Sequence, residues 1–289
     1  MQKSLILLFF CTLPYAINAR QNTVHPWKIV AAETGETVEL PAIIAAMDKA
    51  QILVFGEEHD DSITHVLQKK LYQGLIAKHK KVTLSLEMFE RDVQLVMDEY
   101  LSGLITEAKL VEEGRAWSNY RDYAPLVNLA QEKDQLVSAA NVPGRYANMV
   151  SRKGLGALAL LDRKAKSYFA LFQPPGKEDA YFIKFHEAMG EHAQHMGPRY
   201  FNAQLLRDAT MAESILQSWR KNRKTKILHV TGRFHSDEGL GTVNELKQRK
   251  KNLRIITISS FPSPDFQNPD FKAIQSLADY IILTKPPGK

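Results

Sequence analysis

The chain has 289 residues, of which 44% are hydrophobic and 24% are charged, as is usual for a globular protein of one large or two small domains. Its net charge of +6 is spread along the chain, and we interpret the densest basic runs, 220–224 and 247–251, as solvated helix ends rather than a nucleic-acid surface. After the first fifteen residues, no segment approaches the roughly 18 apolar residues that a membrane span needs.

The first nineteen residues have the pattern of a secretory signal peptide. Lys3 precedes an apolar stretch over 5–13, and Ala19 offers a small residue before a cleavage point. We therefore expect a mature chain that begins at Arg20, is exported, and is periplasmic or associated with the outer membrane. Cys11, the single cysteine, follows the bulky Phe10, which disfavours lipid attachment at this position and leaves it an open alternative.

Six short apolar runs, rich in β-branched residues, alternate with helical patterns along the rest of the chain. They predict strands at 52–55, 82–86, 136–140, 227–230, 255–258 and 280–283. Between them, segments such as 63–76 and 93–101 carry apolar residues at the three- and four-residue spacing of amphipathic helices. The alternation predicts an α/β fold with a wound, mostly parallel sheet and helices on both faces.

One stretch interrupts this rhythm. Residues 162–224 contain no convincing strand and include the loop 173–177 between long helical patterns. We interpret this segment as a helical cap inserted over one edge of the sheet. Residues 20–161 and 225–289 would then form the α/β core domain.

Charged residues follow three of the predicted strands. Glu57 and His59 come after the first, Glu87 and Arg91 after the second, and His235 after the fourth. Because parallel strands end at one edge, these side chains are expected to converge there. Taken singly, each has a plainer interpretation, such as a helix cap, an i,i+4 ion pair or a satisfied polar residue.

The same segments carry a family resemblance. The sequence is similar to the ChaN-like haem-binding uptake family at 55–60, 86–91, 140–143, 203–212 and 230–235, and the block Arg-Asp-Ala-Thr-Met-Ala at 207–212 is its most specific part. The resemblance implies an exported, often lipid-anchored protein linked to iron uptake, with haem held in a dimer by a tyrosine. The wider superfamily resembles Tiki-type metal-dependent proteases and erythromycin-esterase-like proteins, in which Glu/His turns at strand ends form the active site.

The expected cap contains residue types that suit haem. Ferric iron accepts phenolate or imidazole ligands, and porphyrin faces require apolar walls. Helical spacing places Phe185, Met189, His192 and Met196 on one face, with His195 beside them and with Tyr181 and Tyr200 at either end. Tyr146, in a strand-end loop, is a further candidate ligand, and an ordinary apolar core is the alternative interpretation of the stripe. The stripe and the strand-end cluster are separate in sequence, so the two sites need not coincide.

Three hypotheses follow. The favoured one is an exported haem-binding protein that serves haem and iron uptake, forms a homodimer on haem, and works with uptake machinery in the outer membrane. The second is a metal-dependent hydrolase, in which the strand-end residues hold a divalent metal or activate water and Arg91 or Arg207 polarises the substrate. The third is a purely structural network in which Glu57, Glu87 and Arg91 pair as buried charges.

Overall fold

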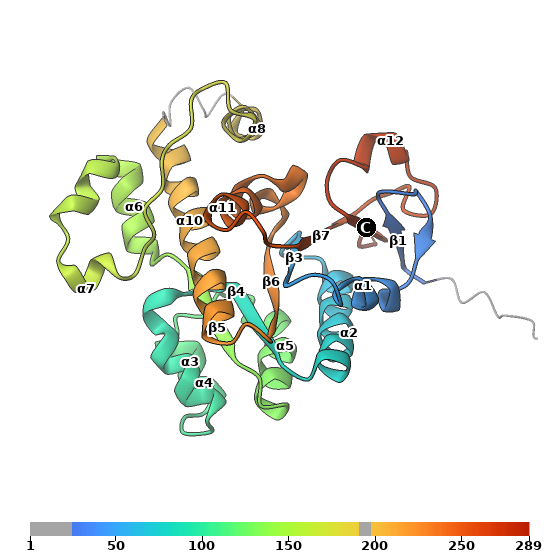
Figure 1. Cartoon of the computed structure of the whole chain (residues 1–289), viewed down its shortest axis with the longest axis horizontal. Coiled ribbons are helices and arrows are strands. Elements are labelled where there is room, and N and C mark those ends of the chain that lie inside the picture. The colour runs from blue at the N-terminus through green and yellow to red at the C-terminus, as the bar shows by residue number, and fades with distance from the viewer. Residues whose placement is uncertain (1–24, 191–197, 289) are drawn as a thin grey trace, which may run out of the picture.

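The computed structural model describes residues 25–190 and 198–288 and contains one eight-stranded sheet (Figure 1). The strand order is β2-β1-β8-β7-β3-β6-β4-β5. The six strands that the sequence predicts are all present and run parallel: β3 (Ile52–Glu57), β4 (Val82–Glu90), β5 (Val137–Asn141), β6 (Lys226–Gly232), β7 (Ile255–Pro262) and β8 (Tyr280–Thr284). The predicted α/β class with a mostly parallel sheet is therefore confirmed.

Two strands were not predicted. β1 (Trp27–Ala31) pairs antiparallel with β8, and β2 (Thr37–Val38) pairs antiparallel with β1. Both are short, and β2 has only two residues, so neither produces a clear periodic pattern. The sheet is consequently mixed at this edge and parallel elsewhere. The expected signal peptide, residues 1–19, lies outside the described residues.

Helices cover both faces of the sheet because the side chains of each strand alternate in direction. In β3, Leu53 and Phe55 face a core that is shared with α2 (Ser62–His79) and α5 (Tyr120–Glu132), whereas Ile52 and Val54 face α10 (Pro198–Lys221) and α11 (Gly241–Arg249). The first layer also includes α1 (Leu40–Ala46), α3 (Gln94–Leu101) and α4 (Glu107–Glu113). None of the described helices is long and apolar enough to cross a bilayer.

The described part of the segment expected to form the cap contains helices joined by loops and no strand. It includes α7 (Arg163–Lys166), α8 (Ala180–Met189) and α10, and it follows α6 (Gly144–Lys153) and the 3-10 helix η2 (Leu155–Leu160). The later half of α10 lies on the sheet, where Ala212, Ile215 and Leu216 pack against β3 and β6. One helix therefore runs from the sheet to the outer helices, so the boundary between core and cap stays a prediction.

Candidate functional site at the carboxyl edge of the sheet

The ends of β3 and β6 lie side by side and bring the predicted polar turns together. Glu57 pairs in register with Gly232, so the turns that carry His59 and His235 leave the sheet at neighbouring points. A Cβ built on Gly232 would lie 2.8 Å from His59 Nε2 and 3.8 Å from Glu87 Oε2. Glycine at 232 therefore leaves the space in which the groups of three strands meet.

Glu57 is the centre of one half of the cluster. Its side chain is buried, and its Oε1 accepts a 2.5 Å hydrogen bond from the hydroxyl of Tyr123 and lies 2.9 Å from His59 Nδ1. Gln68 donates to its Oε2, and His65 Nδ1 lies 3.6 Å from that oxygen. The carboxylate is therefore fully surrounded by polar partners, as burial of a charge requires.

Glu87 and His235 form the other half. Oε2 of Glu87 accepts hydrogen bonds from Thr231 Oγ1 (2.6 Å) and from the Gly232 amide (2.8 Å), and its Oε1 lies 3.4 Å from His235 Nε2. His235 Nδ1 lies 2.7 Å from Asp208 Oδ1 on α10. One imidazole thus lies between two buried carboxylates.

These neighbours decide the charge of each group. Burial disfavours the imidazolium of His235, but Glu87 and Asp208 outweigh that penalty and raise its pKa to about 10. Burial likewise opposes the charge on Glu87, yet the attraction of His235 holds the pKa of that carboxyl well below its usual value. The pKa of His59 is also raised, because its hydrogen bond to Glu57 and the charges of Glu87 and Glu57 exceed the cost of burial.

Arg91 does not join this cluster. Its Nη1 donates to Glu213 Oε2 at 2.8 Å, its Nε donates to Ser214 Oγ at 3.0 Å, and its Nη2 donates to the Thr210 carbonyl at 2.8 Å. The proposed pairing of Arg91 with Glu87, and the three-membered network with Glu57, are therefore wrong. The reason is that β4 continues to Glu90. Residue 87 therefore lies in a strand, and residues 87 and 91 do not share a helical turn.

The candidate haem ligands are distributed differently. Tyr181 is buried and donates to Asp208 Oδ2 at 2.9 Å, so it belongs to the strand-end cluster. Burial, with the charge of Asp208, raises its pKa well above the usual value. Tyr146 is buried against Phe169, whereas Tyr200 is 40% exposed near the start of α10. His192, His195 and Met196 lie outside the described residues.

Several members of the cluster were not assigned to it from the sequence. Tyr123, Gln68 and Thr231 bind the two glutamates, and Gln204 donates to the hydroxyl of Tyr181 at 3.0 Å. Asp208 and Gln204 lie within the 203–212 block that carried the family resemblance, and this was the available signal. Among the described residues, no group of three or more His, Asp or Glu side chains is arranged to hold a metal ion.

Comparisons with known proteins agree with this fold. Residues 43–246 match the model of the family described as haem-binding uptake, Tiki superfamily, ChaN. ChaN of Campylobacter jejuni, solved with cofacially bound haem, superposes with a TM-score of 0.67 over 90% of this chain and 97% of its own, at 16% identity. A Bacillus cereus protein (TM-score 0.51, 11% identity, 86% and 92% covered) and the type III effector HopBA1 (0.50, 13%, 86% and 94%) share the fold.

A search of curated protein sequences finds no match. The family model, however, spans more than half of the chain and includes the strand-end residues from Glu57 to His235. The chain therefore belongs to the ChaN family of haem-binding uptake proteins in the Tiki superfamily.

Proposed function

We propose that the protein binds haem on its outer helices and serves haem or iron uptake as an exported protein. The observation that carries the proposal is an apolar cavity of about 370 Å³ lined by Leu155, Leu158, Phe169, Leu171 and Phe172, among others. Family membership supports haem as the occupant. A porphyrin requires apolar walls of this kind, and a cavity of several hundred Å³ is the size of a ligand pocket.

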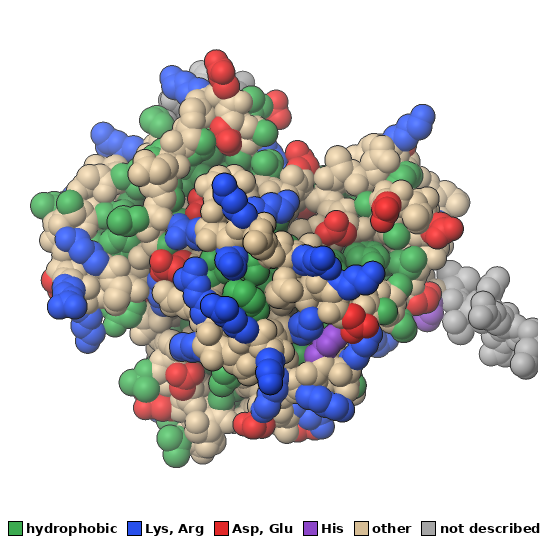
Figure 2. Space-filling view, in the orientation of Figure 1, with side chains coloured by type: hydrophobic (Ala, Val, Ile, Leu, Met, Phe, Trp, Pro, Cys, Tyr) green, Lys and Arg blue, Asp and Glu red, His purple; other side chains and the backbone are tan. Residues whose placement is uncertain are grey.

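Basic residues belong to the same segment as this cavity, and Lys166 lines it. The basic lobe, residues 152–172, contains one acidic residue, Asp162, and five exposed cations: Arg152, Lys153, Arg163, Lys164 and Lys166. Among the described residues, none of the five has a carboxylate within ion-pair distance. Figure 2 shows basic and hydrophobic side chains next to each other over α6 and α7. Unpaired cations beside an apolar cavity suit an amphiphile with carboxylates, such as haem with its propionates.

Tyr200 is the tyrosine that we propose as the iron ligand. Its neighbour Arg199 donates to the Arg152 carbonyl at 2.8 Å, so the start of α10 adjoins the basic lobe. Tyr200 is exposed, whereas the hydroxyl of Tyr181 is bound to Asp208 and its raised pKa disfavours the phenolate. Tyr146, packed on the cavity residue Phe169, is the second candidate.

The wider proposal follows the family resemblance. We propose that two protomers associate through haem, that the mature chain begins at Arg20, and that it meets the uptake machinery at the outer membrane. Exposed apolar residues on or near the lobe, Leu160 and Leu171, support an association through this surface.

A hemin titration of the full mature chain tests the haem proposal. We expect a saturable Soret shift with the spectrum of tyrosinate-bound high-spin iron, and mass measurement before and after hemin addition should show a monomer-to-dimer change. Tyr200→Phe should lose the tyrosinate signature, while Tyr181→Phe serves as the matched control and keeps it. Absence of a saturable shift in the wild-type protein would overturn the proposal.

Hydrolysis at the strand-end cluster is a second candidate function. The observation that favours it is His59, the accessible member of the cluster, with 40% of its side chain exposed and its Nδ1 held by Glu57. This orientation leaves Nε2 for proton transfer to a substrate or water. Hydrolysis with a divalent metal is less favoured, because no group of three or more His, Asp or Glu side chains among the described residues is arranged to hold one. Esterase and peptidase screens of wild-type protein and His59→Ala, with and without chelator, test it, and equal rates for both proteins contradict it.

A further inference from the structure

β5 is the last of the described strands at its end of the sheet, and a side chain completes its outer edge. Gln94 Nε2 donates to the Val137 carbonyl at 2.8 Å, and the Ala139 amide donates to Gln94 Oε1 at 2.8 Å. In a parallel sheet, one residue of a neighbouring strand makes this same pair of bonds to two residues that flank its partner. The Gln94 carboxamide therefore takes the place of the N–H and C=O of one residue of a ninth strand, opposite Ser138.

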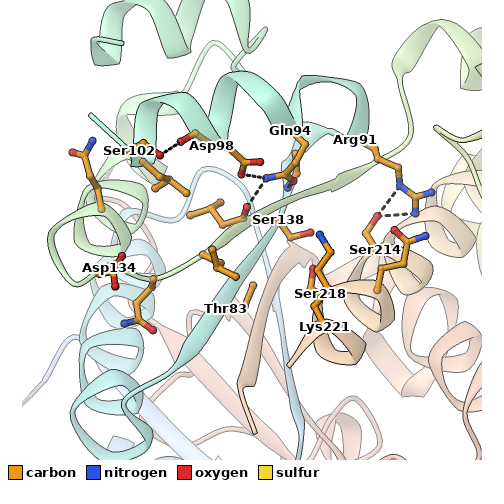
Figure 3. A pocket seen from close by; sticks show the side chains of 17 residues that line it. Thr83, Arg91, Gln94, Asp98, Ser102, Asp134, Ser138, Ser214, Ser218 and Lys221 are labelled. Carbon is orange, nitrogen blue, oxygen red and sulfur yellow. Dashed lines mark hydrogen bonds between the residues drawn. The ribbon is translucent and has the colours of Figure 1, made fainter. Parts of the chain in front are cut away.

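A cavity of about 390 Å³ continues from this point along β5, between α3 and α10 (Figure 3). Hydroxyl and amide groups dominate its walls, among them Ser138 on the strand and Gln217 and Ser218 on α10. Such neutral donors and acceptors suit the peptide groups of an extended chain rather than an apolar ligand. Charged groups also line the cavity. Arg91 pairs with Glu213, Asp134 pairs with Lys81, and Asp98 accepts from Gln94, whereas Lys221 is exposed and has no carboxylate partner in the described part of the chain.

Gln94 has an alternative position when it leaves the strand. It is the first residue of α3, and its Nε2 also donates to Asp98 Oδ1 at 2.8 Å, one turn further along that helix. A displaced carboxamide would therefore keep one of its hydrogen bonds. This remaining hydrogen bond lowers the free-energy cost of replacing the Gln94 carboxamide by the strand of a bound peptide.

We propose that the β5 edge is a binding site for an extended peptide of another protein, which adds parallel to β5, displaces Gln94 and directs an acidic side chain to Lys221. Main-chain hydrogen bonds would supply the affinity, as in other strand-addition sites. The unpaired cation selects an acidic segment over a basic one. No residue that lines the cavity belongs to the basic lobe or to the strand-end cluster.

The test is amide NMR of the full mature chain titrated with the peptide Ac-Thr-Val-Glu-Val-Thr-NH2. We expect saturable shifts of the Ser138 and Ala139 amides, and binding about tenfold tighter to Gln94→Ala, because two hydrogen bonds no longer have to be broken. Lys221→Ala should weaken binding, and Ser218→Trp, which fills the cavity and keeps Gln94, should abolish it.

Three results would overturn the proposal. The first is the absence of saturable shifts in both the wild-type protein and the Gln94→Ala variant. The second is equal affinity for the unmodified peptide and for two versions of it that are N-methylated at alternate residues, one version for each of the two alternating sets. Such peptides cannot pair with a strand edge. The third is concentration-dependent dimerisation of Gln94→Ala without peptide, which would make a second copy of this chain the occupant.

Discussion

His235 Nδ1 lies 2.7 Å from Asp208 Oδ1, and both side chains are buried. The bond joins the turn after β6 to the middle of α10. Asp208 Oδ2 also accepts from Tyr181 on α8, so the outer helices and the strand-end cluster share one hydrogen-bonded network. The two places that are separate in sequence are therefore coupled through Asp208 and through Gln204, which contacts both Tyr181 and His235. A ligand that moves α8 would also alter the surroundings of His235.

The stability of the protein should fall at alkaline pH through His235. Its pKa is about 10 in the folded chain and about 6.5 in an unfolded one, so its contribution is complete below about 6.5 and is lost as pH rises through 10. Urea unfolding of wild-type protein and His235→Gln should differ most near pH 6 and least above pH 10. Asp208→Asn removes one carboxylate and should move this window to lower pH. A difference that does not change with pH would contradict the assignment.

Glu87 should determine the acid limit in the opposite direction. Its pKa is lowered in the folded protein, so its contribution is present above about 4.3, the ordinary value, and is lost as pH falls. Glu87→Gln should therefore reduce the free energy of unfolding at neutral pH and flatten its decline in acid. Glu178→Gln, at an exposed side chain with no ion-pair partner among the described residues, is the control and should leave the acid profile unchanged. Parallel acid profiles for wild-type protein and Glu87→Gln would count against this role.

Arg91 should matter for stability and not for hemin binding. Its guanidinium is nearly buried and joins the end of β4 to Thr210, Glu213 and Ser214 on α10. Breaking such a pair leaves an unmatched group, so Arg91→Met should cost about 3 kcal/mol in urea unfolding. Arg121→Met, at a side chain that is 92% exposed, should stay within about 0.5 kcal/mol of wild type. Hemin affinity should be unchanged in both variants. A selective loss of hemin affinity in Arg91→Met would show that Arg91 takes part in hemin binding.

Gly56 should tolerate no side chain. A Cβ there would lie 2.3 Å from Ser236 Oγ and 2.9 Å from Arg233 Cα. The serine can rotate, but the Arg233 backbone cannot move without disturbing the turn after β6, so Gly56→Ala should cost about 1–3 kcal/mol. Gly156→Ala is the matched control, because a Cβ at Gly156 meets no atom within 4 Å. Equal urea midpoints for the two variants would show that the β3 end has more room than the structure gives it.

The sequence predicted the architecture of the fold better than it predicted the hydrogen-bond partners within the site. Apolar runs located β3 to β8, and the rule that parallel strands end at one edge brought Glu57, His59, Glu87 and His235 together correctly. It could not show that β4 continues past Glu87, and this extension separates Arg91 from the cluster. Periodicity alone assigns the helix that carries Asp208 to the cap, so the signal for Asp208 was its place in the 203–212 block that carried the family resemblance.

The basic lobe should control hemin affinity through charge. Lys166 lines the apolar cavity, Arg152 is joined by its carbonyl to Arg199 beside Tyr200, and neither cation has a carboxylate partner in the described chain. Lys166→Glu combined with Arg152→Glu should weaken hemin binding about tenfold or more at low salt, and added salt should reduce that difference by screening. Lys69→Glu with Lys80→Glu, on and just beyond α2, which packs on the other face of the sheet from α10, is the charge-matched control and should have little effect. Deuteroporphyrin dimethyl ester, which lacks the carboxylates, should bind wild type and the lobe variant alike. If both charge variants weaken hemin equally, the effect belongs to net charge and the lobe is not the haem site.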